Sequence, residues 1–463
     1  MRTFNPELAE IRFGYGLSPM VDPPHSLAQM LDGITGPDAV QTTFPIEDFA
    51  RFRTRMVAAQ KQRKIRRDNR GTARAEQARK QRNVLNRQAR VAMAGWLGQT
   101  LLRRAHTPTA FRERLVAFWA DHFTAMGRQG VVRRGTSPYI EDAIRPFIAS
   151  RFEDLLQSAV MHPLMLDYLD QTRSMGPNSV RAVRRGPDKP SGLNENLARE
   201  VLELHTLGVD GPYSQRDVTQ LAELFTGLTF NARNGFKFRK DFAEPGAETV
   251  LGVSYGAEAN LSEIRAVLRD LAAHPATARH LAQKLAVHFT SDTPDPDLID
   301  ALEGAYLSHG GALMPLYQTL LEHPASWRTP LSNVKPPIDF ISSAGRALGV
   351  PTDHFEGRQE KWLRRWVMAP LVRMGQAWER PLGPDGWAEE DTAWITPHSV
   401  AERVSWAMST PQKLTQDLPD PRGFVDAALG GFAGDAVRFA AAAAESRSEA
   451  IGIVLMSPAF QRR

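Results

Sequence analysis

The stretch from Ser191 to Gly227, here called the focal stretch, constrains the fold most, because it joins two helical patterns through a short glycine-containing turn. The first pattern begins at Asn194 and ends at Gly208, and glycine is the usual residue just beyond a helix C-terminus. The second begins with Ser214-x-x-Asp217, a spacing typical of a helix capping box. We therefore expect two helices here, with the rest of the chain arranged around them.

The helical period recurs along most of the chain, and proline stands just inside several expected helix starts. Residues 228–256 differ, because the alternating Phe236 and Phe238 favour a short hairpin. The pattern predicts an all-α, multi-helical protein with a small irregular or β-hairpin insertion around residues 228–256.

Composition excludes several classes of site. The chain has no cysteine, which rules out disulfides, thiolate metal sites and iron–sulfur clusters. No run of about 18 apolar residues occurs, so we expect no membrane span. The N-terminus lacks the apolar region of a secretory signal, so we expect a cytoplasmic protein.

Positive charge is concentrated in residues 51–90, which hold fifteen Lys and Arg against two acids, whereas the whole chain has a net charge of only +5. Such a block is compatible with a surface for nucleic acid or for an acidic partner. No aromatic residue capable of stacking on bases occurs between Phe52 and Trp96. The block is therefore interpreted as a solvated helical arm, and nucleic acid is the disfavoured partner.

The first helix of the focal stretch carries more polar side chains than packing requires. Asn196, Arg199, Glu200 and Glu203 lie along one stripe, and Glu195 is placed to pair with Arg199 at i, i+4. This stripe marks the helix as the centre of a candidate site.

Two histidines are expected near the stripe. His205 lies close to the helix C-terminus, where the helix dipole favours a protonated imidazole. In F-R-E-R-L-V-A-F-W-A-D-H-F, the residues Leu115, Phe118, Trp119 and His122 share one helical face. His122 should therefore point inward beside Trp119, where a histidine is usually a core residue with one satisfied hydrogen bond.

Standard motifs for nucleotide binding, zinc proteases, serine hydrolases and EF-hand sites are absent, and no cofactor is indicated. A composite metal site between helices would use His122, His205, His288 and Glu200, although the E-x-x-H spacing of di-iron bundles is missing from the focal stretch. The candidate polar pocket consists of Asn194, Glu195, Asn196, Arg199, Glu200, Glu203, His205, Trp119 and His122. It is compatible with a buried polar network that fixes helix packing, with a ligand- or partner-binding site, or with a metal or catalytic centre.

The segment N-E-N-L-A-R-E-V-L-E-L-H-T-L-G-V-D-G-P-Y resembles the hallmark N-E-N-x-A-R-E-L-x-E-L-H-T-L-G-V-D-G-G-Y of the bacterial "domain of unknown function 1800" family. Similar segments extend over nearly the whole chain, including F-W-A-D-H-F, L-A-V-H-F-T-S-D-T-P, D-G-W and S-P-A-F-Q. The resemblance implies an all-helical fold and one family domain over residues 1–463, with the basic arm at about 51–90 as an insertion.

The resemblance leaves the activity open. Members are often encoded beside "domain of unknown function 1501" proteins, which are similar to sulfatases and alkaline phosphatases, so it implies a binding or accessory role toward a protein partner. The alternatives are a metal-dependent hydrolase or oxidoreductase with a His/carboxylate site, and nucleic-acid binding through the basic arm. Many members look exported, whereas this sequence shows no signal.

Four positions depart from the family pattern. Ala120 and Asp121 stand where F-W-H-N-H-F of the family has histidine and asparagine, and Phe242 and Glu248 replace expected histidine and lysine positions. If a metal or catalytic site used those residues, this chain lacks part of it.

Overall fold

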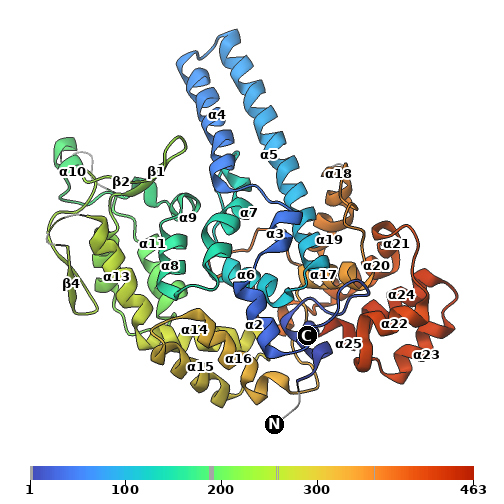
Figure 1. Cartoon of the computed structure of the whole chain (residues 1–463). Coiled ribbons are helices and arrows are strands. Elements are labelled where there is room, and N and C mark those ends of the chain that lie inside the picture. Colours follow the sequence, from blue (N-terminus) through green and yellow to red (C-terminus); the bar gives the residue numbers. More distant parts are fainter. Residues whose placement is uncertain (1–3, 187–191, 257, 259, 359) are drawn as a thin grey trace.

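The computed structural model describes residues 4–186, 192–256, 258, 260–358 and 360–463. Helices make up most of this part of the chain, and strands form only two small antiparallel pairs (Figure 1). The predicted all-α class with a small β insertion is confirmed.

The first half of the chain supplies the arm and the inner helices. Its α-helices are α1 (Pro6–Phe13), α2 (Leu27–Thr35), α3 (Ala39–Thr43), α4 (Phe49–Asp68), α5 (Ala73–His106), α6 (Ala110–His122), α7 (Thr136–Tyr139), α8 (Phe152–Val160), α9 (Pro163–Tyr168), α10 (Val180–Arg185), α11 (Asn196–Glu200) and α12 (Gln215–Leu224). Two π-helical segments interrupt them, η2 (Ile140–Ile144) and η5 (Val201–Thr206).

The second half completes the body. Its α-helices are α13 (Leu261–Ala273), α14 (Pro275–Phe289), α15 (Pro296–Ser308), α16 (Leu313–Glu322), α17 (Pro337–Ala347), α18 (Glu360–Leu363), α19 (Ala369–Arg373), α20 (Pro397–Ser409), α21 (Pro411–Leu414), α22 (Pro421–Leu429), α23 (Asp435–Ala443), α24 (Arg447–Met456) and α25 (Pro458–Gln461). The remaining short turns are the π-helix η7 (Arg364–Met368) and the 3₁₀ turns η1 (Val132–Arg134), η3 (Arg145–Phe147), η4 (Gln171–Arg173), η6 (Pro324–Trp327), η8 (Asp391–Ala393) and η9 (Gly430–Phe432).

All strands among the described residues lie within the predicted insertion at 228–256. They are β1 (Leu228–Asn231), β2 (Gly235–Phe238), β3 (Glu248–Val250) and β4 (Val253–Tyr255). The strand β2 contains the alternating Phe236 and Phe238. In the first pair Phe230 lies opposite Phe236, and in the second Glu248 lies opposite Tyr255. Neither pair contributes a sheet to the centre of the molecule.

Two hydrophobic cores divide the body. The larger core runs from Leu8 to Leu331 and includes α6, α8, α13 and α14, while the smaller core is built on α17, α20, α22 and α24. The helix α5 contributes to both, with Trp96 in the larger core and Leu97 and Leu101 in the smaller one. Charged side chains on α5, α6 and α17 are buried between these cores, and they form part of the candidate site.

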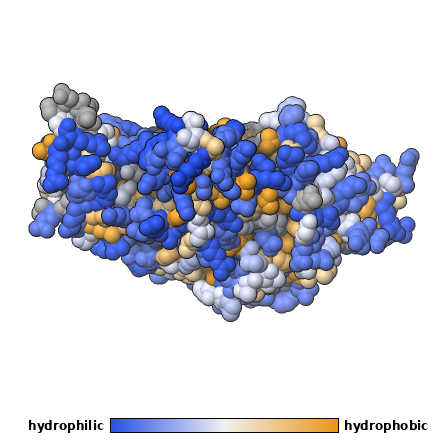
Figure 2. All heavy atoms as spheres, turned by 90° about the horizontal axis from the view of Figure 1, so that it is seen from above, coloured by the Kyte–Doolittle hydropathy of each residue, from blue (hydrophilic) through white to orange (hydrophobic). Residues whose placement is uncertain are grey.

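The basic block forms an antiparallel hairpin of α4 and α5 that stands out from the body (Figure 1). Its base is held by the buried residues Phe52, Met56 and Trp96. Figure 2 views the molecule from the side toward which the hairpin points, and hydrophilic residues cover most of that face. The expected solvated arm is thus a helical hairpin, and its status as an insertion in the family domain stays a prediction.

No helix in the part of the chain that the structure describes is both long enough and apolar enough to cross a bilayer.

Candidate functional site

The polar stripe of the focal stretch lies at the surface and ties α11 to α12. The Arg199 guanidinium lies 3.4 Å from a Glu195 carboxylate oxygen and 3.2 Å from Glu203, as the i, i+4 spacing predicted. Arg199 also donates to Gln215 Oε1 at 2.8 Å, and Gln215 donates back to Glu195 at 2.9 Å. Asn196 is exposed. The network therefore exists, but it is not the buried network that was one of the interpretations.

Asn194 holds the start of α11. Its Oδ1 accepts a hydrogen bond from the Asn196 N–H at 3.0 Å, and its amide donates to the Leu169 carbonyl at 2.8 Å. The second helix of the stretch begins with the predicted capping box of Ser214 and Asp217. These residues position helices and leave the interior chemistry to other side chains.

The second half of the first helix is the π-helix η5. The Leu207 N–H donates to the Leu202 carbonyl at 2.9 Å, five residues earlier, and the helix ends before Gly208, which has φ +90°. Single π turns inside helices are frequent at functional sites. Within this turn His205 is buried, with only 1% of its surface exposed.

Three histidines meet beneath η5. His122 Nε2 lies 3.2 Å from the His205 carbonyl, and His280 Nε2 lies 3.1 Å from the Leu204 carbonyl. The His122 ring centroid is 6.1 Å from that of His205 and 6.2 Å from that of His280. His122 packs beside Trp119, as predicted, and makes one hydrogen bond.

These histidines are neutral. Burial, and then the nearby Lys284 ammonium, lowers the pKa of His205 to about 3 and that of His280 to about 4. The same causes lower the pKa of His122 well below its ordinary value. The expectation of a protonated His205 is wrong, because desolvation outweighs the attraction of the helix dipole.

The proposed metal ligands do not form one set. Within residues 4–463, leaving aside the undescribed positions, no group of three or more His, Asp or Glu side chains could hold a metal ion. His122 and His205 are neighbours, whereas His288 pairs with Glu389 instead. The metal interpretation therefore lacks a preformed ligand set.

Glu200 connects the focal stretch to the loop of residues 376–389. It is half-buried, and burial, Glu203 and Asp385 together raise its pKa to about 7. Asp385 belongs to that loop. Burial, and then the charges of Glu200 and Asp385, raise the pKa of Tyr168 to about 12. The carboxylate of Asp385 thus extends the site away from α11.

One stripe of α14 continues the site from the histidines toward a cavity. His280, Lys284 and His288 follow one another at i, i+4 and i+8 and therefore share a face. The Lys284 charge lowers the pKa of His205 and His280 near one end of this stripe. Near the other end it acts to lower the pKa of Asp121 and of Glu389.

The buried His288 pairs with the partly exposed Glu389. The His288 Nδ1 lies 2.8 Å from Glu389 Oε1, while His288 Nε2 has no partner among the described residues. Burial alone would raise the pKa of Glu389, but His288 and Arg463 hold it below its ordinary value. Because Glu389 is therefore a carboxylate, His288 donates from Nδ1, and Nε2 carries the free lone pair.

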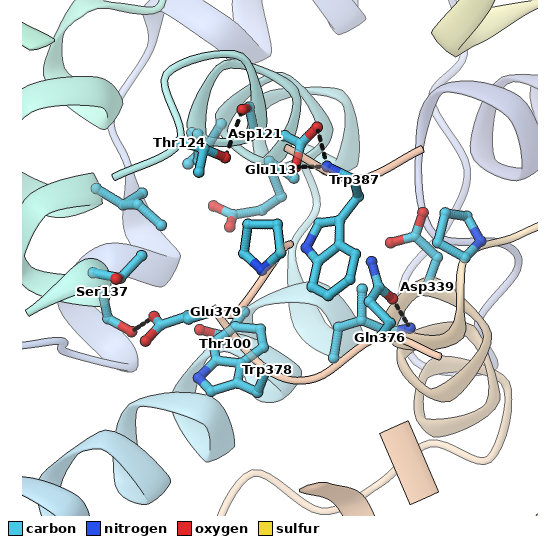
Figure 3. A pocket seen from close by; sticks show the side chains of 18 of the residues that line it. Thr100, Glu113, Asp121, Thr124, Ser137, Asp339, Gln376, Trp378, Glu379 and Trp387 are labelled. Carbon is cyan, nitrogen blue, oxygen red and sulfur yellow. Dashed lines mark hydrogen bonds between the residues drawn. The ribbon is translucent and has the colours of Figure 1, made fainter. Parts of the chain in front are cut away.

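A cavity of about 180 Å³ lies between α5, α6, η2, α17 and the loop of residues 376–389 (Figure 3). His288 lines it, as do Ala120 and Asp121 at the end of α6. Cavities with a few converging polar groups and shifted pKa values are the usual sites of ligand binding.

Arginines neutralise the carboxylates on the helical wall of the cavity. Arg145 forms a bidentate pair with Glu113, at 2.7 and 2.8 Å, and Arg103 binds Glu141 at 2.6 Å. Burial would raise the pKa of Glu113, but Arg145 lowers it overall.

Asp339 is the most heavily paired of these carboxylates. Arg104 lies 3.3 Å away, Arg463 lies 3.0 Å away, and Arg114 also donates to it. These guanidinium groups overcome the effect of burial and hold the pKa of Asp339 well below its ordinary range.

Two carboxyls at the cavity have no such partner. Asp121 accepts a hydrogen bond from the Trp387 N–H at 3.0 Å, and Glu379 accepts one from the Ser137 hydroxyl (Figure 3). Neither forms an ion pair with any described residue. Burial raises the pKa of each to about 7, and Glu389 contributes further to the shift at Asp121.

The loop backbone is shaped around these carboxyls. Glu379 has φ +53°, a conformation that is strained for a residue other than glycine. Gly386 has φ +85°, and a Cβ there would lie 2.6 Å from Asp121 Oδ2. Glycine at 386 therefore allows the Trp387 backbone to approach Asp121.

Sequence reasoning missed most of this cavity. It identified His288 as a metal candidate and noted Ala120 and Asp121 as departures, but it assigned no role to Glu379 or Glu389. The sequence feature that could have indicated this loop was the D-G-W segment within the Trp-, Gly- and Pro-rich residues 378–397.

A family model described as "Protein of unknown function (DUF1800)" matches residues 11–462. No curated protein and no solved structure matches the chain.

Proposed function

This chain belongs to the DUF1800 family, and from that premise we propose that it binds a small molecule in the cavity under residues 376–389 and performs acid–base chemistry on it. The observation that carries this proposal is the free Nε2 of His288 at a cavity that also has two unpaired carboxyls. Buried polar groups are nearly always hydrogen-bonded, so an unpartnered one at a cavity indicates a missing partner.

The groups at the cavity are suited to opposite proton transfers near neutral pH. The Nε2 lone pair of His288 is a general base, and Glu389 orients the ring and stabilises it once it is protonated. Asp121 and Glu379 hold protons below about pH 7 and are therefore general acids. The proposed reaction class is proton transfer to and from a bound molecule of small size.

The first test is retention of a small molecule by the intact chain. The protein is incubated with the small-molecule fraction of a native extract, desalted and examined by native mass spectrometry. We expect a bound species that is lost in Ala120→Phe, which fills the cavity, and kept in Ala442→Phe on the exposed side of α23. Retention of the same species by Ala120→Phe, with circular dichroism showing that it is folded, would contradict the proposal.

A second function, as a binding or accessory partner of another protein, is favoured by the basic arm. Eight of its exposed cations make no ion pair with any described residue: Lys61, Arg63, Lys64, Arg66, Arg70, Arg74, Lys80 and Arg87. A projecting element with unpaired charge of one sign fits an acidic surface.

The arm is tested by a pull-down from native extract with wild type and with Lys61→Gln/Lys64→Gln/Arg66→Gln. An acidic protein recovered in stoichiometric amount by wild type alone would support the role, and recovery of no such protein would count against it. Binding of duplex DNA at low salt would instead favour the nucleic-acid alternative, because phosphate contacts are strongest there.

A further inference from the structure

The charges that line the cavity do not balance. Four arginines and six carboxyl groups line it, and the arginines are all engaged with carboxylates of the helical wall. Glu389 is engaged with His288 and Arg463. Asp121 and Glu379 form no ion pair with any described residue, although Lys284 and Arg380 lie close enough to act on their charges, so the cavity is bordered by two acidic groups without a paired cation.

The remaining walls of the cavity are apolar. Val116, Ile140 and Leu371 line it, together with the indoles of Trp378 and Trp387. Indole faces attract cations, and this attraction is strongest where water is excluded. The combination of uncompensated carboxyls with indole rings is therefore suited to an organic cation.

Other ligand classes fit less well. Above about pH 7, where the two unpaired carboxyls are ionised, they would repel an anion, and a neutral molecule would leave both of them without a counter-charge. A bare metal ion would need at least three convergent ligands, and the described part of the chain offers no such group.

Resting on the proposed function, we propose that the ligand of this cavity is a small organic cation, with an ammonium group at Asp121 or Glu379 and an apolar part against the indoles. A cavity of about 150 Å³ holds a benzene-sized molecule, so about 180 Å³ accommodates roughly six to ten non-hydrogen atoms.

This assignment has a characteristic dependence on pH. Asp121 faces Glu389, Asp385 and the Lys284 ammonium, while Glu379 faces Ser137 and Arg380. With a carboxyl pKa of about 7, the ionised fraction rises from about 0.1 at pH 6 to about 0.9 at pH 8. Affinity for a cation should therefore rise about tenfold over that interval when one carboxyl contacts it.

The experiment is calorimetric titration of the full-length protein with three probes of similar size: butylammonium, 1-butanol and butanoate. An alkylammonium stays protonated at pH 6 and at pH 8. We expect butylammonium to bind most tightly, and more tightly at pH 8 than at pH 6. Binding should release protons, so the observed binding enthalpy should differ between buffers of different ionisation enthalpy.

Two variants and a control locate the site. Asp121→Asn and Glu379→Gln should each weaken butylammonium binding, and the one in contact with the ammonium should also flatten its pH dependence. Glu445→Gln removes an exposed carboxylate that does not line the cavity and should change neither. If one variant fails to fold, the other variant and the pH dependence of the wild type still decide the matter.

Tighter binding of 1-butanol or butanoate than of butylammonium would overturn the cation while leaving a ligand cavity. Binding of none of the probes would also overturn it, and the mass-spectrometric comparison of Ala120→Phe then decides separately whether the cavity binds any molecule.

Discussion

Carboxyl groups lie on both walls of the cavity, but their pKa values are shifted in opposite directions. On the helical wall, Glu113 and Asp339 are surrounded by guanidinium groups, which lower their pKa values despite burial. On the other side, Asp121 and Glu379 form no ion pair with any described residue, and burial raises their pKa values to about 7. A nearby guanidinium group, more than burial, decides which carboxyl is ionised.

The carboxyls of the two walls differ in how much of the fold depends on them. The paired wall joins α5, α6, η2 and α17, so its charges fix helix packing between the two cores. The unpaired carboxyls lie at the end of α6 and in a loop, where fewer helices depend on them. Substitutions on the two walls should therefore have different consequences.

The largest effect is expected for Asp339→Asn on the paired wall. Removing this charge leaves Arg104, Arg114 and Arg463 with an uncompensated buried charge. Breaking a buried ion pair typically costs about 3–5 kcal/mol. Urea denaturation at pH 7 measures the free energy of unfolding, and a loss below about 1 kcal/mol would show that water or other groups satisfy these arginines.

An intermediate effect is expected for Gly386→Ala at the junction of loop and α6. The new Cβ would meet Asp121 Oδ2, and the residue would keep an unfavourable φ of +85°. We expect a loss of about 1–3 kcal/mol in the free energy of unfolding. Combining it with Asp121→Ala should recover the part due to the clash, and no recovery would assign the whole loss to backbone strain.

An effect of opposite sign is expected for Asp121→Asn on the unpaired wall. The pKa of this carboxyl is about 7 in the folded state and near 4 in the unfolded chain, so folding takes up a proton between these pH values. Stability contributed by the protonated group is therefore present below pH 4 and is lost as pH rises through 7. The variant lacks this loss, which the difference between a pKa of about 7 and one near 4 limits to about 4 kcal/mol, so it should be more stable than wild type by at most that amount at pH 8 and equal to it near pH 4. Thermal unfolding across pH measures this difference, and a variant less stable at pH 8 would mean that Asp121 is compensated in the free protein.

The smallest effect is expected in the arm, which extends the comparison to charges in solvent. Lys61→Gln/Lys64→Gln/Arg66→Gln should change the free energy of unfolding by less than about 0.5 kcal/mol, because none of the three forms an ion pair among the described residues. Affinity for a polyanion such as heparin should nevertheless fall. Stability measured by urea and affinity measured by salt elution would separate the two roles, and a large loss of stability would show that these charges support the hairpin.

Local patterns predicted the helices and their ends well. The capping box at Ser214 and the inward face containing His122 depend on residues within one or two turns, and the structure has both. The family resemblance also held over nearly the whole length. These features depend on residues that are close together in the sequence, so the spacing of residue types is sufficient to predict them.

The cavity could not be predicted in this way. His288 and Glu389 are 101 residues apart, and Arg104 and Asp339 are 235 apart. The loop that carries Glu379 and Glu389 has no period that would tell which side chains face inward. Polar residues on the focal stretch were prominent in the sequence, yet most of them serve the surface contact between α11 and α12.

The helix α5 belongs to the arm and to the cavity at once. Its 34 residues span about 50 Å, from the exposed tip of the hairpin to Arg103 and Arg104 in the paired wall. Phe52 and Trp96, whose ring centroids are 6.1 Å apart, clamp it between these ends. The helix is therefore one continuous element that joins the arm to the cavity wall and is packed against α4 between these ends. If a protein of the kind proposed above binds the arm and moves α5, occupation of the cavity should change its affinity by the same factor by which it changes the affinity of the cavity, because coupling between two sites is reciprocal. Titrating a partner with and without the cavity ligand measures that factor.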